Sequence, residues 1–298
     1  MDSVNSSPRP SLFVALLGLA LLAVSPGCAS LVRATADRTK TVTHVDGSDL
    51  VVETRNGGVR VVVDPARGGA EIAAHVTARA ETRPEAEARL DEIEVHATRR
   101  DDGALFVHVV YPDDEPRGGE GCALVITLGV VGDVRVRTSN GEVSVDGANG
   151  ALDVRTSNGA IDVVGGAEAT LATSNGNVGA RLVPGPLDVT TSNGGVALAD
   201  VGGRTKVRTS NGRIRLESRG DHRSVFDLKT SNGDVDVFLP GQPSARVDVR
   251  TSNGGIVVDG ADEVEGSKRR KTVRFGGGEP ACEVTTSNGD VRLVRTGA

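Results

Sequence analysis

Apolar and polar residues alternate along most of the chain in short stretches, such as Val134 to Val136 and Val143 to Val145. Many of these stretches flank the same tetrapeptide, Thr-Ser-Asn-Gly, and the alternation resumes after it. Period-two alternation is typical of β-strands that bury one face. The pattern therefore predicts two short strands in each repeat, with the tetrapeptide between them.

The tetrapeptide occurs eight times, and the variant Thr-Arg-Asn-Gly adds an earlier copy. From the first Thr-Ser-Asn-Gly onward, successive copies lie 18, 17, 18, 18, 21, 21 and 35 residues apart. A period near 18 residues is typical of stacked supersecondary units. The nine asparagines are Asn56, Asn140, Asn158, Asn175, Asn193, Asn211, Asn232, Asn253 and Asn288.

Aligning the copies on the asparagine gives columns of aliphatic residues on both sides. The residue three positions after it is always β-branched, as in Val143, Ile161 and Val178. Counted with a period of two, the threonine and asparagine fall on the same side as these aliphatic residues, whereas the serine points outward. We therefore expect an inward structural ladder of asparagines, bonded from rung to rung, beside glycines with positive φ.

Two folds fit this pattern. Asn-Gly is a common type I′ hairpin turn, which would give an antiparallel meander. Alternatively, it is the corner of a rung in a parallel β-solenoid. A long meander would need a covering layer, and the chain has only five Phe, one Tyr and no Trp to fill a wide interior. The sequence therefore favours an all-β, right-handed parallel β-solenoid with rungs of about 18 residues.

Residues 41–130 read as an N-terminal rung and capping segment, and residues 131–298 as the solenoid of repeats. Pro84 to Ile93 is predicted as a short helix with Thr82 as its N-cap. The strands expected on either side of Asp101 to Gly103 would place His96 opposite His108. Two histidines without a third ligand do not predict a metal site.

The first 27 residues resemble a signal peptide, with an apolar run from Leu12 to Val24. Cys28 follows Gly27 as in bacterial lipoproteins, so we expect lipidation at Cys28, with cleavage after Ala29 as the alternative. Residues 28–40 would then be a lipid-anchored tether. Cys122 and Cys282 fall in distant repeats, which argues against a disulfide between them.

The net charge of −6 argues against a nucleic-acid partner, and no phosphate-binding loop or cofactor motif is present. Basic residues such as Arg137 and Arg208 recur three positions before the asparagine, and acidic ones such as Asp153 and Asp227 five positions before it. These columns either bind a polymer or neutralise one another, and their alternation in sign favours neutralisation. A basic run, 268–271, is either part of a protruding loop or extra rung, or a lipid head-group patch.

Several features of the chain occur together in one known family. They are the lipoprotein-type leader, Asn56-Gly57, the helix with Ala86 and Leu90, the strand beginning Leu105-Phe106, the repeated tetrapeptides and a late Gly-Gly-Gly. In these features the chain resembles the DUF4097 family. These bacterial, adhesin-like proteins are related to the head domain of auto-transporter adhesins. The resemblance implies a right-handed β-helix in the cell envelope, and it carries no catalytic residues to this chain.

The sequence thus favours a non-enzymatic envelope lipoprotein that is adhesin-like or scaffolding. Its expected partners are an envelope or extracellular ligand, either protein or polysaccharide, and a membrane bound through the lipid anchor. The outer membrane is the expected location, with periplasmic and surface display both open. One alternative is a polysaccharide-processing β-helix enzyme, but paired carboxylates and aromatic platforms are missing. The other is an accessory component of an envelope-stress system.

Overall fold

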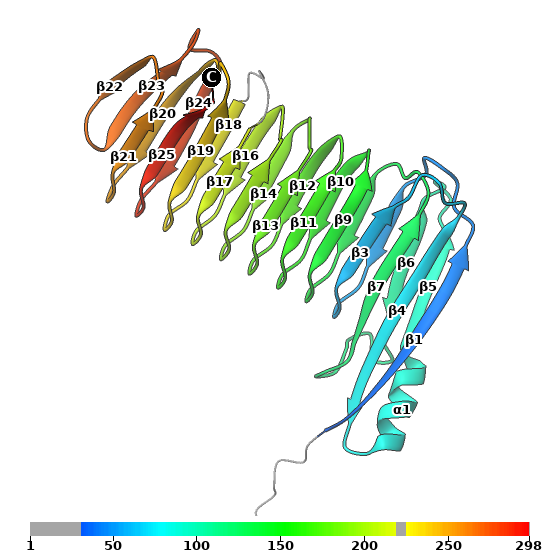
Figure 1. Cartoon of the computed structure of the whole chain (residues 1–298). Coiled ribbons are helices and arrows are strands. Elements are labelled where there is room, and N and C mark those ends of the chain that lie inside the picture. The colour runs from blue at the N-terminus through cyan, green and yellow to red at the C-terminus, as the bar shows by residue number, and fades with distance from the viewer. Residues whose placement is uncertain (1–30, 219–224, 298) are drawn as a thin grey trace, which may run out of the picture. The chain divides into compact units, whose positions relative to one another are not determined.

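The computed structural model describes residues 31–218 and 225–297. The predicted signal peptide and Cys28 therefore lie outside the described residues. The described strands form two sheets, sheet A with 12 strands and sheet B with 13. Figure 1 shows the strands of the two sheets stacked rung upon rung.

Each central rung has one strand in each sheet, and the tetrapeptide connects them. For example, β14 (Leu187–Thr190) lies in sheet B and β15 (Val196–Ala199) in sheet A. Both pair in parallel with the equivalent strands of the next rung, β16 (Arg204–Arg208) and β17 (Ile214–Glu217). The parallel pairing confirms the β-solenoid and excludes the antiparallel meander. The other central strands are β8 (Val134–Arg137), β9 (Val143–Ala148), β10 (Ala151–Arg155), β11 (Ile161–Gly165), β12 (Glu168–Ala172), β13 (Val178–Arg181), β18 (Val225–Lys229) and β19 (Val235–Pro240).

At both ends of the stack, the order of rungs in space differs from their order in sequence. The early rung of β2 (Leu50–Glu53) and β3 (Val59–Val63) lies between the β8–β9 rung and a later rung, β6 (Leu105–Val110) with β7 (Gly121–Leu128). At the other end, the last rung inserts beside β18 and β19, inside the rung that precedes it in sequence. The strands concerned are β20 (Ala245–Thr251), β21 (Ile256–Asp259), β24 (Ala281–Thr286) and β25 (Val291–Thr296).

Antiparallel strands extend the sheets beyond the terminal rungs. In sheet A, β1 (Val32–Val42) pairs with β4 (Ala70–Ala80), which pairs with β7. Residues 32–40, predicted as part of a tether, therefore belong to a strand, because alternate residues such as Ala34 reach the core. In sheet B, β5 (Glu94–Arg99) pairs with β6, and β22 (Glu263–Gly266) pairs with β23 (Arg270–Phe275) beside β20. These strands pair with the terminal rungs, and β1, β5 and β22 then form the outer edges of the sheets.

The one helix of the described residues, α1 (Arg83–Glu92), begins as its sequence predicts. Thr82 accepts a hydrogen bond from the Glu85 backbone N–H, and the Glu85 carboxylate accepts one from the Thr82 backbone N–H. This capping box satisfies two amides that the helix leaves unpaired. Ala86 and Leu90 are the buried helical residues, and the helix contacts β1 and β4.

Aliphatic residues from the facing sides of the two sheets form one core along the stack. Val, Leu and Ile fill most of it, and Phe226 and Phe275 are its largest fully buried side chains. Because each rung closes on itself, small β-branched residues suffice to fill the space between the sheets. The near absence of aromatic residues therefore agrees with a narrow solenoid.

Cys122 on β7 and Cys282 on β24 are both buried and do not join in a disulfide. The rungs that hold them are eight steps apart in the order of sheet A, which is about 40 Å at ~4.8 Å per step. Burial raises the pKa of Cys122 to about 12 and that of Cys282 to about 11. The sequence-based expectation that these two cysteines are distant and form no disulfide with each other is confirmed.

We expect both thiols to resist modification in the folded protein at pH 8, because a buried thiol with a raised pKa supplies almost no thiolate. In protein that carries Cys28→Ser, the two thiols should react with a maleimide only after denaturant has unfolded the chain. Fast labelling at either position under native conditions, with the fold intact by circular dichroism, would contradict the burial described here.

Candidate functional site: the motif edge and the charged face

The threonine of each Thr-Ser-Asn-Gly copy points into the core. Thr191, for example, is 3% exposed, and its Oγ1 donates a hydrogen bond to the backbone carbonyl of Gly176 at 3.2 Å. Thr156, Thr173 and Thr209 make the same bond to the glycine of the preceding rung. The motif threonine thus bonds each corner to its neighbour from inside.

The asparagines form one column, in which each amide Nδ2 donates to the Oδ1 of the preceding rung. From Asn158 onward the distance is 2.8 Å at each step, and the column passes from Asn232 to Asn288 and then to Asn253. These eight motif asparagines, beginning with Asn140, are exposed, and Asn56 is half-buried. The prediction that the ladder points inward was therefore wrong, because it lies on the outer edge.

The reason is a bend at the serine. In rung after rung, the backbone N–H groups of both Ser and Asn donate to one carbonyl, as Ser157 and Asn158 do to the Ser139 carbonyl at 3.2 and 2.9 Å. Two consecutive amides that point the same way break the alternation of a strand. The alternation of buried and exposed side chains is therefore interrupted between Thr and Asn, and both Ser and Asn face solvent.

The motif glycine is required by space and not by a left-handed backbone. Positive φ occurs at Gly57 and Gly141, but it is not found at the later motif glycines. A Cβ at Gly194 would lie 1.9 Å from the carbonyl oxygen of Gly176. The rungs approach so closely at this point that only a hydrogen fits.

We expect Thr191→Val to destabilise the protein more than Asn193→Ala does. Valine leaves the Gly176 carbonyl without its hydroxyl donor inside the fold, which costs about 1–3 kcal/mol. Alanine at 193 removes two exposed hydrogen bonds of the ladder, to Asn175 and from Asn211, and water replaces them, so we expect a cost of about 0.5–1 kcal/mol. Denaturant unfolding of both variants measures the difference, and the reverse order would show that the ladder, and not the threonine, holds the corner.

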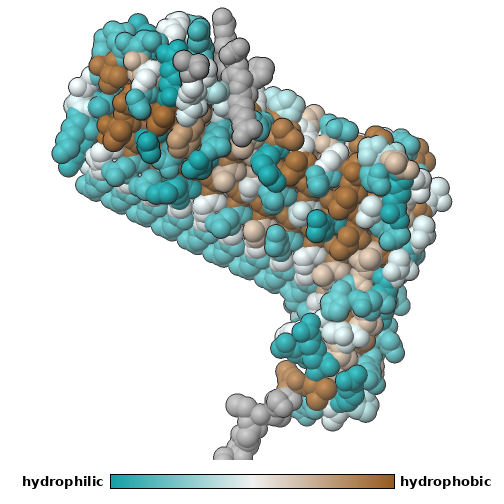
Figure 2. Space-filling model, in the orientation of Figure 1, coloured by the Kyte–Doolittle hydropathy of each residue, from teal (hydrophilic) through white to brown (hydrophobic). Residues whose placement is uncertain are grey.

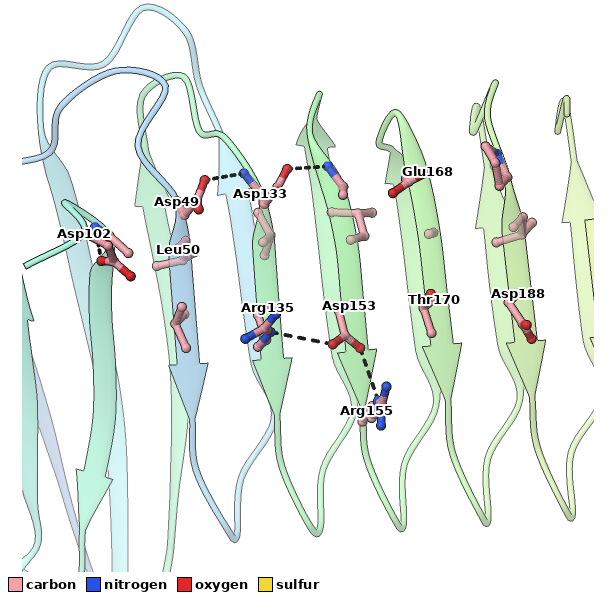
Figure 3. A pocket seen from close by; sticks show the side chains of 18 of the residues that line it. Asp49, Leu50, Asp102, Asp133, Arg135, Asp153, Arg155, Glu168, Thr170 and Asp188 are labelled. Atoms are coloured by element: carbon pink, nitrogen blue, oxygen red, sulfur yellow. Dashed lines mark hydrogen bonds and ion pairs between the residues drawn. The ribbon is translucent and has the colours of Figure 1, made fainter. Parts of the chain in front are cut away.

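The outer face of sheet B carries a groove of about 790 Å³ over several rungs. Figure 3 shows acidic and basic side chains along it, including Asp133, Arg135, Asp153 and Asp188. Within it, the Asp133 carboxylate accepts a hydrogen bond from the backbone N–H of Ala151 at 2.8 Å. Part of the groove's charge therefore serves the connection between rungs.

The basic and acidic columns of this face pair diagonally between rungs. Arg137 bonds Asp153 of the next rung, and Arg208 bonds Asp227 in the same way. Burial acts to raise the pKa of Asp153, but the hydrogen bond and charge of Arg137, aided by Arg155, outweigh it and lower that pKa. This pairing indicates that the two columns neutralise one another, and it does not support a charged strip that binds a polymer.

His96 and His108 lie opposite each other on β5 and β6, as predicted, with ring centroids 5.1 Å apart. Phe106 also stacks on His108, with ring centroids 4.6 Å apart, and the guanidinium of Arg100 lies over Phe106 at 3.8 Å. Burial, together with the charge of His96, lowers the pKa of His108. Within residues 31–218 and 225–297, no group of three or more His, Cys, Asp or Glu is placed to hold a metal ion.

The basic run 268–271 lies at the turn of the β22–β23 hairpin and the start of β23. Lys271 Nζ donates to the backbone carbonyl of Ile256 at 3.2 Å, so one of the four cations is engaged with the fold. The long spacing between the last two repeats therefore accommodates a hairpin beside β20. The extra-rung interpretation was wrong, because β23 runs antiparallel to β20.

The whole motif column follows the lower tips of the rungs in Figure 1, and the same edge is a continuous hydrophilic row in Figure 2. Sequence reasoning found the asparagines but placed them on the wrong side, and it treated the serine only as a residue that faces outward. The available signal was that the residue before the asparagine is serine in eight of the nine copies. No helix of the described residues has the length and apolarity needed to cross a membrane.

The model of the Toastrack DUF4097 family matches residues 48–294. Similar solved structures include a protein of Bacteroides fragilis NCTC 9343 provisionally named an adhesin, with 12% identity and a TM-score of 0.39, covering 88% of this chain and 97% of that one. Two Parabacteroides distasonis ATCC 8503 proteins, provisionally named an adhesin and a lipid-binding protein, show 9% identity, TM-scores of 0.37 and 0.29, and the same coverage. The curated proteins gave no match.

Proposed function

Because this chain belongs to the DUF4097, or Toastrack, family, we propose that it is an exported, non-enzymatic binding protein of the cell envelope. It acts in an adhesin-like manner through its repetitive outer surface, and Cys28 anchors it to the outer membrane as a lipoprotein. Its ligand is an envelope or extracellular protein or polysaccharide. The observation that carries the proposal is the uninterrupted column of exposed Ser and Asn side chains, repeated at every rung from Ser139 onward.

The ionisation of three aspartates supports binding over catalysis. Glycoside hydrolysis by a carboxylate pair needs one acid whose pKa is raised. The pKa values of Asp153, Asp234 and Asp248 are lowered. Hydrogen bonds and nearby arginines keep these groups ionised, as suits structural pairing between rungs.

Binding and cleavage are separated by incubating the purified protein with a panel of envelope and extracellular polysaccharides and proteins. We expect saturable binding to at least one of them, without release of cleavage products. Products that accumulate with time, in proportion to protein concentration, would contradict the non-enzymatic assignment.

The anchor is tested on cells that express the whole chain and are fed a clickable fatty acid. We expect label on the wild-type protein and none on the Cys28→Ser variant, and protease treatment of intact cells then distinguishes surface from periplasmic display. Equal labelling of wild type and Cys28→Ser would refute lipidation at this cysteine.

A further inference from the structure

Three of the four residues of the repeated tetrapeptide have a visible structural role. The threonine bonds the preceding rung from inside, the asparagine does so from outside, and the glycine allows the backbones to approach. The serine side chain has no such role, because in the described residues no motif serine hydroxyl makes a hydrogen bond. These exposed serines are Ser139, Ser157, Ser174, Ser192, Ser210, Ser231, Ser252 and Ser287.

The backbone holds these hydroxyls in a fixed register. Each of the serines from Ser157 to Ser210 donates its backbone N–H to the carbonyl of the serine in the preceding rung, at 3.2 to 3.3 Å. Parallel strands repeat every ~4.8 Å, so eight successive serines span about 34 Å. A row fixed in this way loses little conformational entropy when a ligand binds.

The asparagine ladder beside the serines keeps half of its hydrogen-bonding capacity. An amide side chain has two N–H donors and an oxygen with two lone pairs. Within the ladder, Asn193 uses one N–H on Asn175 and one oxygen lone pair on Asn211. Each rung therefore offers solvent one hydroxyl, one amide N–H and one carbonyl lone pair, without a charged or aromatic group in these two columns.

Resting on the proposed function, we propose that this Ser-Asn edge binds an extended, uncharged polysaccharide of the β-1,4-linked type. Each sugar of such a chain advances it by about the spacing between rungs, and equivalent hydroxyls face the edge at every second sugar. Hydroxyls both donate and accept hydrogen bonds, so they match donors and acceptors that carry no charge. Hydrogen bonds to water compete with each contact, so single sugars are held weakly. Affinity therefore accumulates along the edge and depends on the length of the polysaccharide.

The variant that tests the edge replaces Ser157, Ser174, Ser192 and Ser210 with alanine together. Its matched control removes four hydroxyls from the outer faces of the sheets: Ser144→Ala, Thr170→Ala, Thr190→Ala and Thr285→Ala. Thermal unfolding identifies both as folded before binding is compared. The probes are microcrystalline cellulose and chitin, with soluble β-1,4-linked oligosaccharides of increasing length.

We expect the wild type to bind one of these polymers, with an affinity that rises with oligosaccharide length. The four-serine variant should bind ~30-fold more weakly, which corresponds to four lost hydrogen bonds at the low end of their net value. The control should bind within about twofold of the wild type. Unchanged binding by the four-serine variant, equal loss in the control, or no dependence on length would overturn the proposal.

Failure of this inference can be told apart from failure of the proposed function. If the protein binds only a charged polysaccharide or a protein from the wider panel, and the four-serine variant binds it equally well, the Ser-Asn edge is refuted while the envelope-binding function stands. If neither cellulose, chitin nor any panel member is bound, both are refuted.

Discussion

Gly194→Ala is expected to destabilise the protein by about 3–5 kcal/mol, more than overpacking usually costs, because the clash is with backbone atoms. The added Cβ would lie 1.9 Å from the Gly176 carbonyl oxygen and 2.5 Å from its carbon. Both atoms belong to the backbone of the adjacent rung, which is bonded to further rungs on its other side. The clash therefore cannot be relieved by rotating a side chain. Denaturant unfolding measures the loss.

The adjacent residue gives the control. A Cβ at Gly195 would have its nearest neighbour, the Arg213 carbonyl oxygen, at an ordinary contact distance of 3.5 Å. Gly195→Ala should change the free energy of unfolding by less than about 0.5 kcal/mol. Similar stabilities for the two variants would mean that the corners do not approach as described.

Arg89→Met is expected to destabilise the protein by about 3–5 kcal/mol, because it leaves the buried carboxylate of Glu120 without its cationic partner and with only the Arg117 backbone N–H bonded to it. Arg89 Nε donates to Glu120 Oε1 at 2.8 Å, and the Glu120 side chain is completely buried. The hydrogen bond to Glu120 also holds the pKa of the Arg89 guanidinium above its usual value. Methionine keeps the aliphatic stem, so the loss reports the charge and not the packing. The free energy of unfolding is again the readout.

Two further variants test the ion-pair explanation. Arg83→Met removes an exposed partner of Glu87 from the same helix and should cost less than about 0.5 kcal/mol. Adding Glu120→Gln to Arg89→Met should recover part of the stability, because the carboxylate is then replaced by a neutral amide. A loss below about 1 kcal/mol for Arg89→Met would show that the pair contributes little to the N-terminal cap.

Local patterns in the sequence predicted most of the fold. The alternation around each asparagine predicted the two strands of a rung, and Thr82 with Pro84 predicted the start of α1. The spatial order of the end rungs could not be predicted from the sequence, because β3 and β9 present similar aliphatic columns to either neighbour. The antiparallel strands β1 and β4 were also missed, since they lack the tetrapeptide that identified the strands of the repeats.

The candidate site shows a different limit of sequence reasoning. Counting parity through the tetrapeptide assumes that every residue continues the strand, and two successive amides bonded to one carbonyl violate that assumption. The count therefore placed the threonine correctly and the asparagine incorrectly. Only the geometry separates the threonine, asparagine and glycine, which hold the rungs together, from the serine, whose side chain does not.

The orientation of the motif is tested most directly by single cysteines at Thr191, Ser192 and Asn193, in a chain whose three native cysteines are replaced by serine or alanine. The measurement is the rate of maleimide labelling under native conditions. We predict that Ser192→Cys and Asn193→Cys label at rates close to those of an unfolded control, and that Thr191→Cys is protected. Protection at 193, with rapid labelling at 191, would contradict the outward edge on which the proposed binding surface depends.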